Sequence, residues 1–114
     1  MYAQGTLYMS RTAPLAVRAA DGTFQLSLLL MDRIGPHCVE PWRVVWTGEA
    51  ARAWWQANQG ALQPGQALQV QACGMRAFVA NGRAPETHAR VIGCALAGKA
   101  AAAAADGAAA TEEA

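Results

Sequence analysis

Aromatic side chains and arginines recur along the predicted strands of this 114-residue chain. Aromatic rings stack on unpaired bases and arginines pair with phosphates, so together they suit a surface that holds a single nucleic-acid strand. For each residue the alternative is structural, because rings also pack in cores and scattered arginines remain solvated. The candidate contact residues are Tyr8, Arg18, Trp42, Arg43, Trp46, Arg76, Phe78, Arg83 and Arg90.

Patterns for catalysis or metal binding are missing from the sequence. His37 and His88 have no Ser, Cys or carboxylate at a recognisable motif spacing, and neither glycine-rich phosphate-loop pattern occurs. The three cysteines include no Cys-x-x-Cys pair, so we expect no disulfide framework and no zinc site. Cys38, Cys73 and Cys94 are predicted to be reduced and partly buried. We therefore expect no enzyme, no cofactor and no metal.

The charge is divided between the body of the chain and its end. Residues 1–98 carry eight arginines against five carboxylates, a net charge of +3, whereas the remainder has a net charge of −2. A basic body favours a polyanionic partner, although a coding bias toward Arg, Ala and Gly is the favoured explanation of the composition. The small excess predicts modest affinity for such a partner.

Two strands are predicted in the N-terminal third. Residues 23–31 alternate between a fully apolar face and a mixed face, which is typical of a half-buried strand. Asp21-Gly22 favours a turn before this strand, so residues 5–17 are its predicted hairpin partner. Pro14 interrupts that partner, because proline has no N–H to donate to a sheet.

A loop, a strand and a helix follow. Residues 32–41 contain a Gly-Pro pair and a second proline, and are predicted to be a loop. Residues 42–47 are predicted to be a strand that ends at Gly48. Residues 49–60 are rich in Ala, Gln and Arg, which favour a helix, and Thr47 is its expected N-cap.

The last two predicted strands are residues 68–78 and 87–96, joined by a turn at Asn81-Gly82. Gln63-Pro64-Gly65-Gln66, before the first of them, has the proline and glycine of a type II turn. The order β-β-β-α-β-β is that of the oligonucleotide-binding (OB) fold, a mainly β, five-stranded Greek-key barrel. The helix between strands three and four distinguishes the OB fold from other small barrels, because SH3-like and cold-shock barrels lack a helix of this length at that position.

The chain is predicted to be one domain with a tail. Residues 1–97 would form the barrel, and the Ala-rich, mildly acidic residues 98–114 have nothing to bury and are expected to be disordered. No apolar run of about 18 residues or signal-peptide pattern occurs, so we expect a cytoplasmic protein without a membrane partner.

Several motifs in the middle of the chain resemble bacterial single-stranded DNA-binding proteins and the related primosomal replication protein. They are Arg43-Val44-Val45, Gly48 before the helix, Pro64-Gly65-Gln66, and the Leu-Gln-Val-Gln-Ala-Cys-Gly stretch of residues 68–74. The resemblance covers residues 5–96 as a pattern and residues 42–76 by motif.

This resemblance implies sequence-tolerant binding of single-stranded DNA by a homodimer or homotetramer at the bacterial nucleoid, in replication, repair or mobile-element transfer. Replication or repair proteins are implied as further partners, although Glu112 and Glu113 lack the closing aromatic residue of such acidic tails. RNA remains open as the ligand, because the 2′-hydroxyl is recognised by local geometry. The alternative function is a protein-interaction adaptor with little or no nucleic-acid binding, which the low net charge favours.

The resemblance also suggests which side chains face outward. If the Arg-Val-Val match sets the register, Arg43 lies outside while Trp42 and Trp46 face the core, and a shift of one residue reverses this. Trp54 and Trp55 are adjacent on the helix and point about 100° apart. One should plug the barrel, and the other should cover a subunit contact or shield apolar surface.

Overall fold

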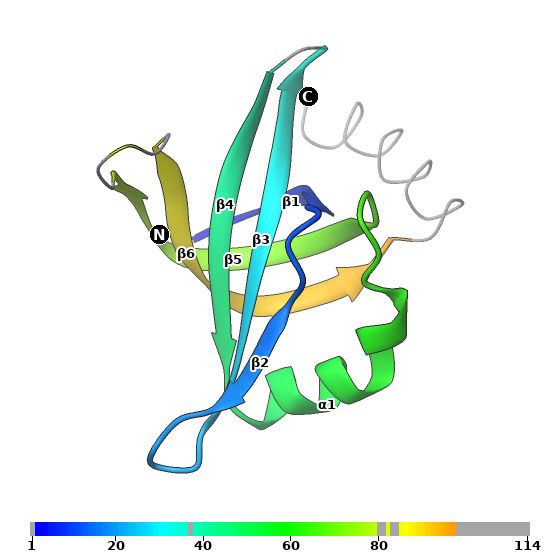
Figure 1. Cartoon of the computed structure of the whole chain (residues 1–114), viewed down its shortest axis with the longest axis vertical. Helices are drawn as coiled ribbons and strands as arrows, with labels where there is room; N and C mark the ends of the chain where they lie inside the picture. The colour runs from blue at the N-terminus through cyan, green and yellow to red at the C-terminus, as the bar shows by residue number, and fades with distance from the viewer. Residues whose placement is uncertain (1, 37, 80–81, 83–84, 98–114) are drawn as a thin grey trace.

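The computed structural model describes residues 2–36, 38–79, 82 and 85–97, which form one closed barrel. Its single sheet has the order β1-β5-β6-β4-β3-β2, and an additional β1–β3 pairing closes it (Figure 1). This confirms the predicted OB fold. The predicted tail, residues 98–114, lies outside the described residues. The elements are β1 (Tyr2–Met9), β2 (Leu15–Arg18), β3 (Phe24–Gly35), β4 (Cys38–Thr47), α1 (Glu49–Asn58), a 3₁₀ turn (Gln59–Ala61), β5 (Ala67–Phe78) and β6 (Glu86–Leu96).

The predicted first strand is present as two pieces. β1 pairs with β5 along most of its length and with β3 at Tyr8 and Met9, whereas β2 pairs, among the described residues, with β3 alone. The break falls before Leu15, where Pro14 cannot donate a hydrogen bond. One sequence segment therefore supplies both the strand that closes the barrel and a short edge strand.

The predicted loop at residues 32–41 is wrong. β3 and β4 continue as a two-stranded hairpin whose pairing runs from Met31 and Pro41 to Gly35 and Cys38, and the hairpin projects from the barrel (Figure 1). Pro41 is tolerated because the pairing of β4 with β6 begins only at Trp42, so the proline occupies an edge position.

The predicted type II turn and the predicted helix cap have different outcomes. The type II turn is confirmed, because the Gln66 N–H donates to the Gln63 carbonyl at 3.0 Å and Gly65 has a φ of 87°. The helix cap is corrected, since α1 begins after Gly48 without a side-chain cap. Gly48 has φ 103° and ψ −175°, a conformation reserved for glycine, and its N–H donates to the Phe24 carbonyl at 3.0 Å. Thr47 is thus displaced from the capping position by a sharp glycine turn.

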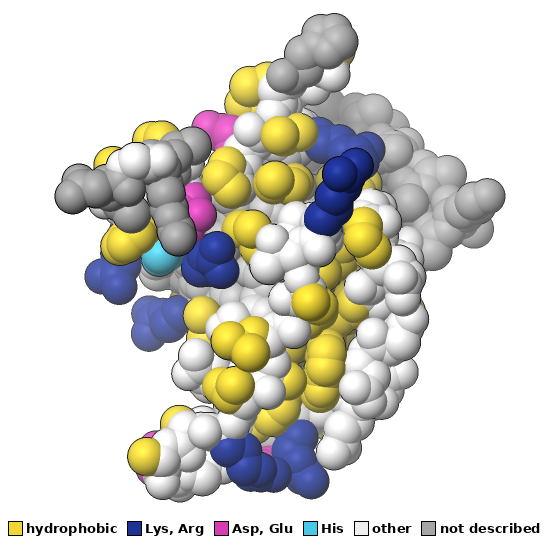
Figure 2. All heavy atoms as spheres, in the orientation of Figure 1, with side chains coloured by type: hydrophobic (Ala, Val, Ile, Leu, Met, Phe, Trp, Pro, Cys, Tyr) yellow, Lys and Arg dark blue, Asp and Glu magenta, His cyan; other side chains and the backbone are white. Residues whose placement is uncertain are grey.

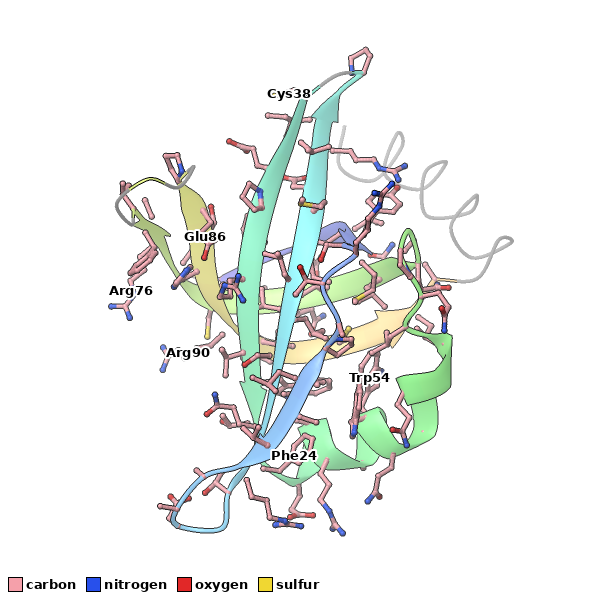
Figure 3. The ribbon with its side chains drawn as sticks, viewed as in Figure 1. Phe24, Cys38, Trp54, Arg76, Glu86 and Arg90 are labelled. Atoms are coloured by element: carbon pink, nitrogen blue, oxygen red, sulfur yellow. The ribbon has the colours of Figure 1, made fainter. Side chains whose placement is uncertain are left out.

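α1 covers one end of the barrel. Ala51 is fully buried under it, and the Trp54 ring meets Trp46 with ring centroids 5.8 Å apart at 49°. Trp54 points from α1 toward the barrel (Figure 3). Trp55 also packs against the core, but it lies in a groove beside β2 with Val17. Trp54 is therefore the expected plug, and both helical tryptophans shield apolar surface.

No helix in the described ranges is long and apolar enough to cross a membrane.

The Gly48 conformation generates a stability prediction. Gly48→Ala should lower the free energy of unfolding by about 1–3 kcal/mol, because the backbone conformation is strained for any residue with a Cβ. A Cβ at Gly48 would meet nothing within 4 Å, so the loss would be conformational and not steric. Gly60→Ala is the matched control, since a Cβ there also meets nothing and its φ is not positive. Urea unfolding of both variants measures this, and equal stability would contradict the assigned turn.

Candidate nucleic-acid interface

One row of outward-facing side chains crosses four strands of the barrel. Arg43 on β4 lies opposite Leu29 on β3 and His88 on β6, and His88 lies opposite Arg76 on β5. Val44, the next residue of β4, is fully buried. The predicted register, with Arg43 outside, is therefore confirmed. We call this side of β1, β3, β4, β6 and β5 the outer face.

Four side chains interlock near the middle of the outer face. Arg43 Nε donates to Glu86 Oε1 at 3.0 Å, and His88 Nε2 lies 2.8 Å from the same oxygen. The hydrogen bond from His88 and then that from Arg43 hold the pKa of Glu86 below its usual value, against a small opposing effect of burial. Phe78 stacks on His88 with centroids 4.4 Å apart at 17°. We call these four residues the Glu86 cluster.

Arg76 and Arg90 flank the Glu86 cluster and are exposed. Figure 3 shows both arginines and Glu86 on the side of the barrel formed by β5 and β6. The Arg90 guanidinium lies over Gly74, where φ is +63° and a Cβ would come within 3.0 Å of Arg90 Nε. The glycine at this irregular point of β5 thus makes room for the arginine.

A groove continues the outer face toward β1. It has a volume of about 440 Å³ and is lined by Tyr8, Arg11, Leu29, Met31, Arg33 and Val39, among others. The Arg33 guanidinium lies 4.1 Å above the centre of the Tyr8 ring, a cation–π contact. Figure 2 shows apolar side chains along the barrel with arginines on both sides, and a histidine, in cyan, beside acidic and basic groups.

Sequence reasoning missed Arg33, Glu86 and His88 as site residues. Arg33 lies in the segment wrongly predicted to be a loop, although continuing the alternation of residues 23–31 would have placed it on the outer face. Glu86 and His88 lie two residues apart and so share a face of β6, but their partner Arg43 lies 43 residues from Glu86 in the chain, which the local sequence does not show.

The two tryptophans of β4 lie on the inner side. Trp46 is 9% exposed and packs in the core. Trp42 is half-buried and lines a cavity of about 240 Å³, with Asp32 and Gly5, at the end of the barrel away from α1. Burial favours the packing alternative for Trp46, and Trp42 does not share the face of Arg43.

The other predicted contact residues fall into three groups: those on the outer face, one on β2, and one outside the described residues. Tyr8, Arg43, Arg76, Phe78 and Arg90 share the outer face, as described above. Arg18 on β2 donates through Nη1 to the Gly22 carbonyl at 2.9 Å and lines the groove beside α1 with Arg52. Arg83 lies outside the described residues.

The cysteines differ in their surroundings. Cys38 is exposed at the end of the β3–β4 hairpin, which corrects the expected partial burial, whereas Cys73 and Cys94 are half-buried. Burial raises the pKa of Cys94 to about 12, so this thiol stays protonated at neutral pH. Across the described ranges, no three His, Cys, Asp or Glu side chains gather where they could hold a metal ion.

The chain matches no protein-family model and no curated protein sequence. Solved structures do resemble it. The SSB domain of a Synechococcus sp. protein has a TM-score of 0.57 and 16% identity, covering 82% of this chain and 91% of that one. The small single-stranded DNA-binding protein of Streptomyces coelicolor has a TM-score of 0.57 and 15% identity, covering 84% and 93%.

The mitochondrial single-stranded DNA-binding protein of S. cerevisiae has a TM-score of 0.58 and 8% identity, covering 84% of this chain and 94% of that one. At such identities the similarity concerns the fold. The chain therefore has the OB fold found in these single-stranded DNA-binding proteins.

Proposed function

We propose that this protein binds single-stranded DNA across the outer face of its barrel, without strong sequence preference. The observation that carries the proposal is the continuous run of arginines and aromatic rings from the Tyr8–Arg33 contact on β1 and β3 to Phe78 and Arg76 on β5. OB folds bind oligonucleotides on the equivalent strands and their adjoining loops.

The aromatic rings of the outer face suit base stacking. Phe78 is 46% exposed and stacks on His88, so part of its ring surface is available to a base. Tyr8, half-buried under Arg33, lies near the opposite edge of the face. Stacking contributes about 1–3 kcal/mol per base and tolerates any base, because every base has a π-face.

The distribution of charge supports a polyanionic ligand more strongly than the net charge does. Arg33, Arg43, Arg76 and Arg90 all project from the outer face. Asp32 and Glu40 form a pair on the other side of the β3–β4 hairpin. A strand crossing the outer face would thus meet guanidinium groups while these carboxylates point away from it.

The biological setting is part of the same proposal. The protein would protect exposed single strands in the bacterial cytoplasm during replication, repair or mobile-element transfer. Pairing of subunits is supported by β1, which between Tyr2 and Leu7 has β5 as its one neighbouring strand within the described part of the chain. Such a free edge is a ready template for another strand.

A protein-interaction adaptor is the second candidate. The groove between β2 and α1 favours it, because Trp55 lies there beside Val17 and the nearby Leu15 is 58% exposed. Capture of a partner that survives nuclease treatment, together with negligible oligonucleotide binding, would select this function.

Binding is tested with a fluorescently labelled oligo-dT by anisotropy. Four arginine–phosphate contacts predict a slope of log affinity against log salt of about −2.8, hence about a 50-fold loss between 50 and 200 mM salt. A duplex of the same length should bind more weakly, since its bases cannot stack on the protein. Absence of binding at 20 mM salt would overturn the proposal.

Two substitutions test the two parts of the outer face. Phe78→Ala should weaken oligo-dT binding about 5- to 100-fold by removing one stacking platform. Arg76→Ala should weaken it several-fold and reduce the salt slope by about 0.7, since one phosphate contact is lost. Arg52→Ala on α1 removes the same charge away from the outer face and should change neither quantity. Equal effects of the two arginine variants would contradict the assigned face.

The free edge of β1 predicts an oligomer. Light scattering after size-exclusion chromatography should give two or four times the chain mass of 11.9 kDa. Proline at Gln4, within the free segment, would remove an N–H and add a ring at the edge, so Gln4→Pro should shift the mass toward the monomer. Gln69→Pro on β5, a strand paired on both sides, is expected to prevent folding instead. A monomer in the unchanged protein would refute this part.

A further inference from the structure

Glu86 is a carboxylate within a surface proposed to hold a polyanion. Its side chain is 16% exposed, and Arg43 and His88 both form hydrogen bonds with its Oε1 atom. Because these bonds lower its pKa, the group stays ionised at neutral pH. An ionised carboxylate repels phosphates. Glu86 would therefore weaken DNA binding unless it also has a favourable effect on neighbouring residues.

The first role concerns Arg43. Its Nε donor is occupied by Glu86, which orients the planar guanidinium. Within the described residues, its Nη1 and Nη2 groups make no hydrogen bond and retain their four N–H donors. A guanidinium oriented in this way is prepared for a bidentate contact with a phosphate.

The second role concerns His88. Its ring is held by Phe78 on one face and by Glu86 at Nε2. Neutral histidine that donates through Nε2 has only a lone pair at Nδ1, which repels a phosphate oxygen. Charged histidine donates through both nitrogens, so a phosphate at Nδ1 favours the charged form.

We propose that Glu86 is a positioning residue that directs Arg43 and His88 at the phosphodiester backbone, and that through His88 it couples DNA binding to the uptake of about one proton. This inference rests on the proposed function. The proton comes from the solvent and adds to Nδ1, and no covalent bond changes.

The charged groups around His88 explain why binding and protonation are coupled. Arg43 faces it from β4, Arg76 from β5, and Arg90 and Glu86 from β6. Three guanidinium groups and one carboxylate therefore surround the ring. An arriving phosphate offsets the arginines, so the charged imidazole is stabilised most in the complex. Affinity should therefore rise as the pH falls.

The first experiment measures oligo-dT affinity by anisotropy from pH 8.5 to 5.5 at constant ionic strength. The unchanged protein should bind about tenfold more tightly at pH 6 than at pH 8, since one proton is taken up over part of this range. Glu86→Gln should bind three- to tenfold more weakly at pH 6 and show a flatter profile. Glu86→Asp, which keeps the charge, should restore part of the pH dependence.

Glu40→Gln is the matched control. It removes one negative charge from the exposed hairpin without touching Arg43 or His88, and should leave affinity equal or slightly increased. A carboxylate that only repelled DNA would make Glu86→Gln bind more tightly as well. The sign of the change thus separates positioning from repulsion, and thermal melting verifies that each variant is folded.

The second experiment needs no change at Glu86. Calorimetric titration with oligo-dT near pH 7, in buffers of different ionisation enthalpy, measures proton uptake directly. Uptake should persist in His37→Gln and disappear in His88→Gln.

Two results would overturn the positioning role alone: tighter binding by Glu86→Gln at every pH, or no proton uptake by a protein that binds DNA. Failure of the unchanged protein to bind at any pH would instead refute the proposed function, and the positioning role with it.

Discussion

The alternation of side chains along β4 is the constraint on which both the core and the candidate interface depend. β4 pairs with β3 on one side and with β6 on the other, so its inward residues fill the barrel and its outward residues meet both neighbours. Burial of Val44 and Trp46 holds the register, because a shift of one residue would expose both. The same register places Arg43 beside His88. Hydrophobic burial on the inner side of β4 thus determines which charged residues lie together on its outer side.

The parallel pairing of β4 and β6 explains why the Glu86 cluster exists. Parallel neighbours need a long crossover, and here α1 and β5 supply it. The crossover delivers Glu86 and His88 to Arg43, while α1 covers the barrel end through Trp54. The helix therefore acts twice: it closes the core and spans the distance that brings the charged residues together.

Local patterns in the sequence predicted most of the fold, and long-range pairing explains most of what they missed. The strand at residues 23–31 and the Pro64-Gly65 turn depend on residues close together in the sequence, and both were predicted correctly. The hairpin at residues 32–41 was missed because its prolines suggested a loop, although Pro41 sits at an edge where its lost N–H is tolerated. Glu86 was missed because one of its two partners, Arg43, reaches it from another strand, and the local sequence around Glu86 and His88 gives no sign of that contact.

Net charge is a poor guide to function in this barrel, because opposite charges lie on different sides of the same strands. Arg33 and Asp32 are adjacent in sequence, so strand alternation sends their charges to opposite sides of β3. Such a surface can attract a polyanion locally while the whole chain carries only +1. At a Debye length of about 8 Å in physiological salt, a phosphate responds to the groups within that reach and hardly to the total. The low net charge therefore does not favour an adaptor over a DNA-binding protein, since a phosphate responds to the local arrangement of charge.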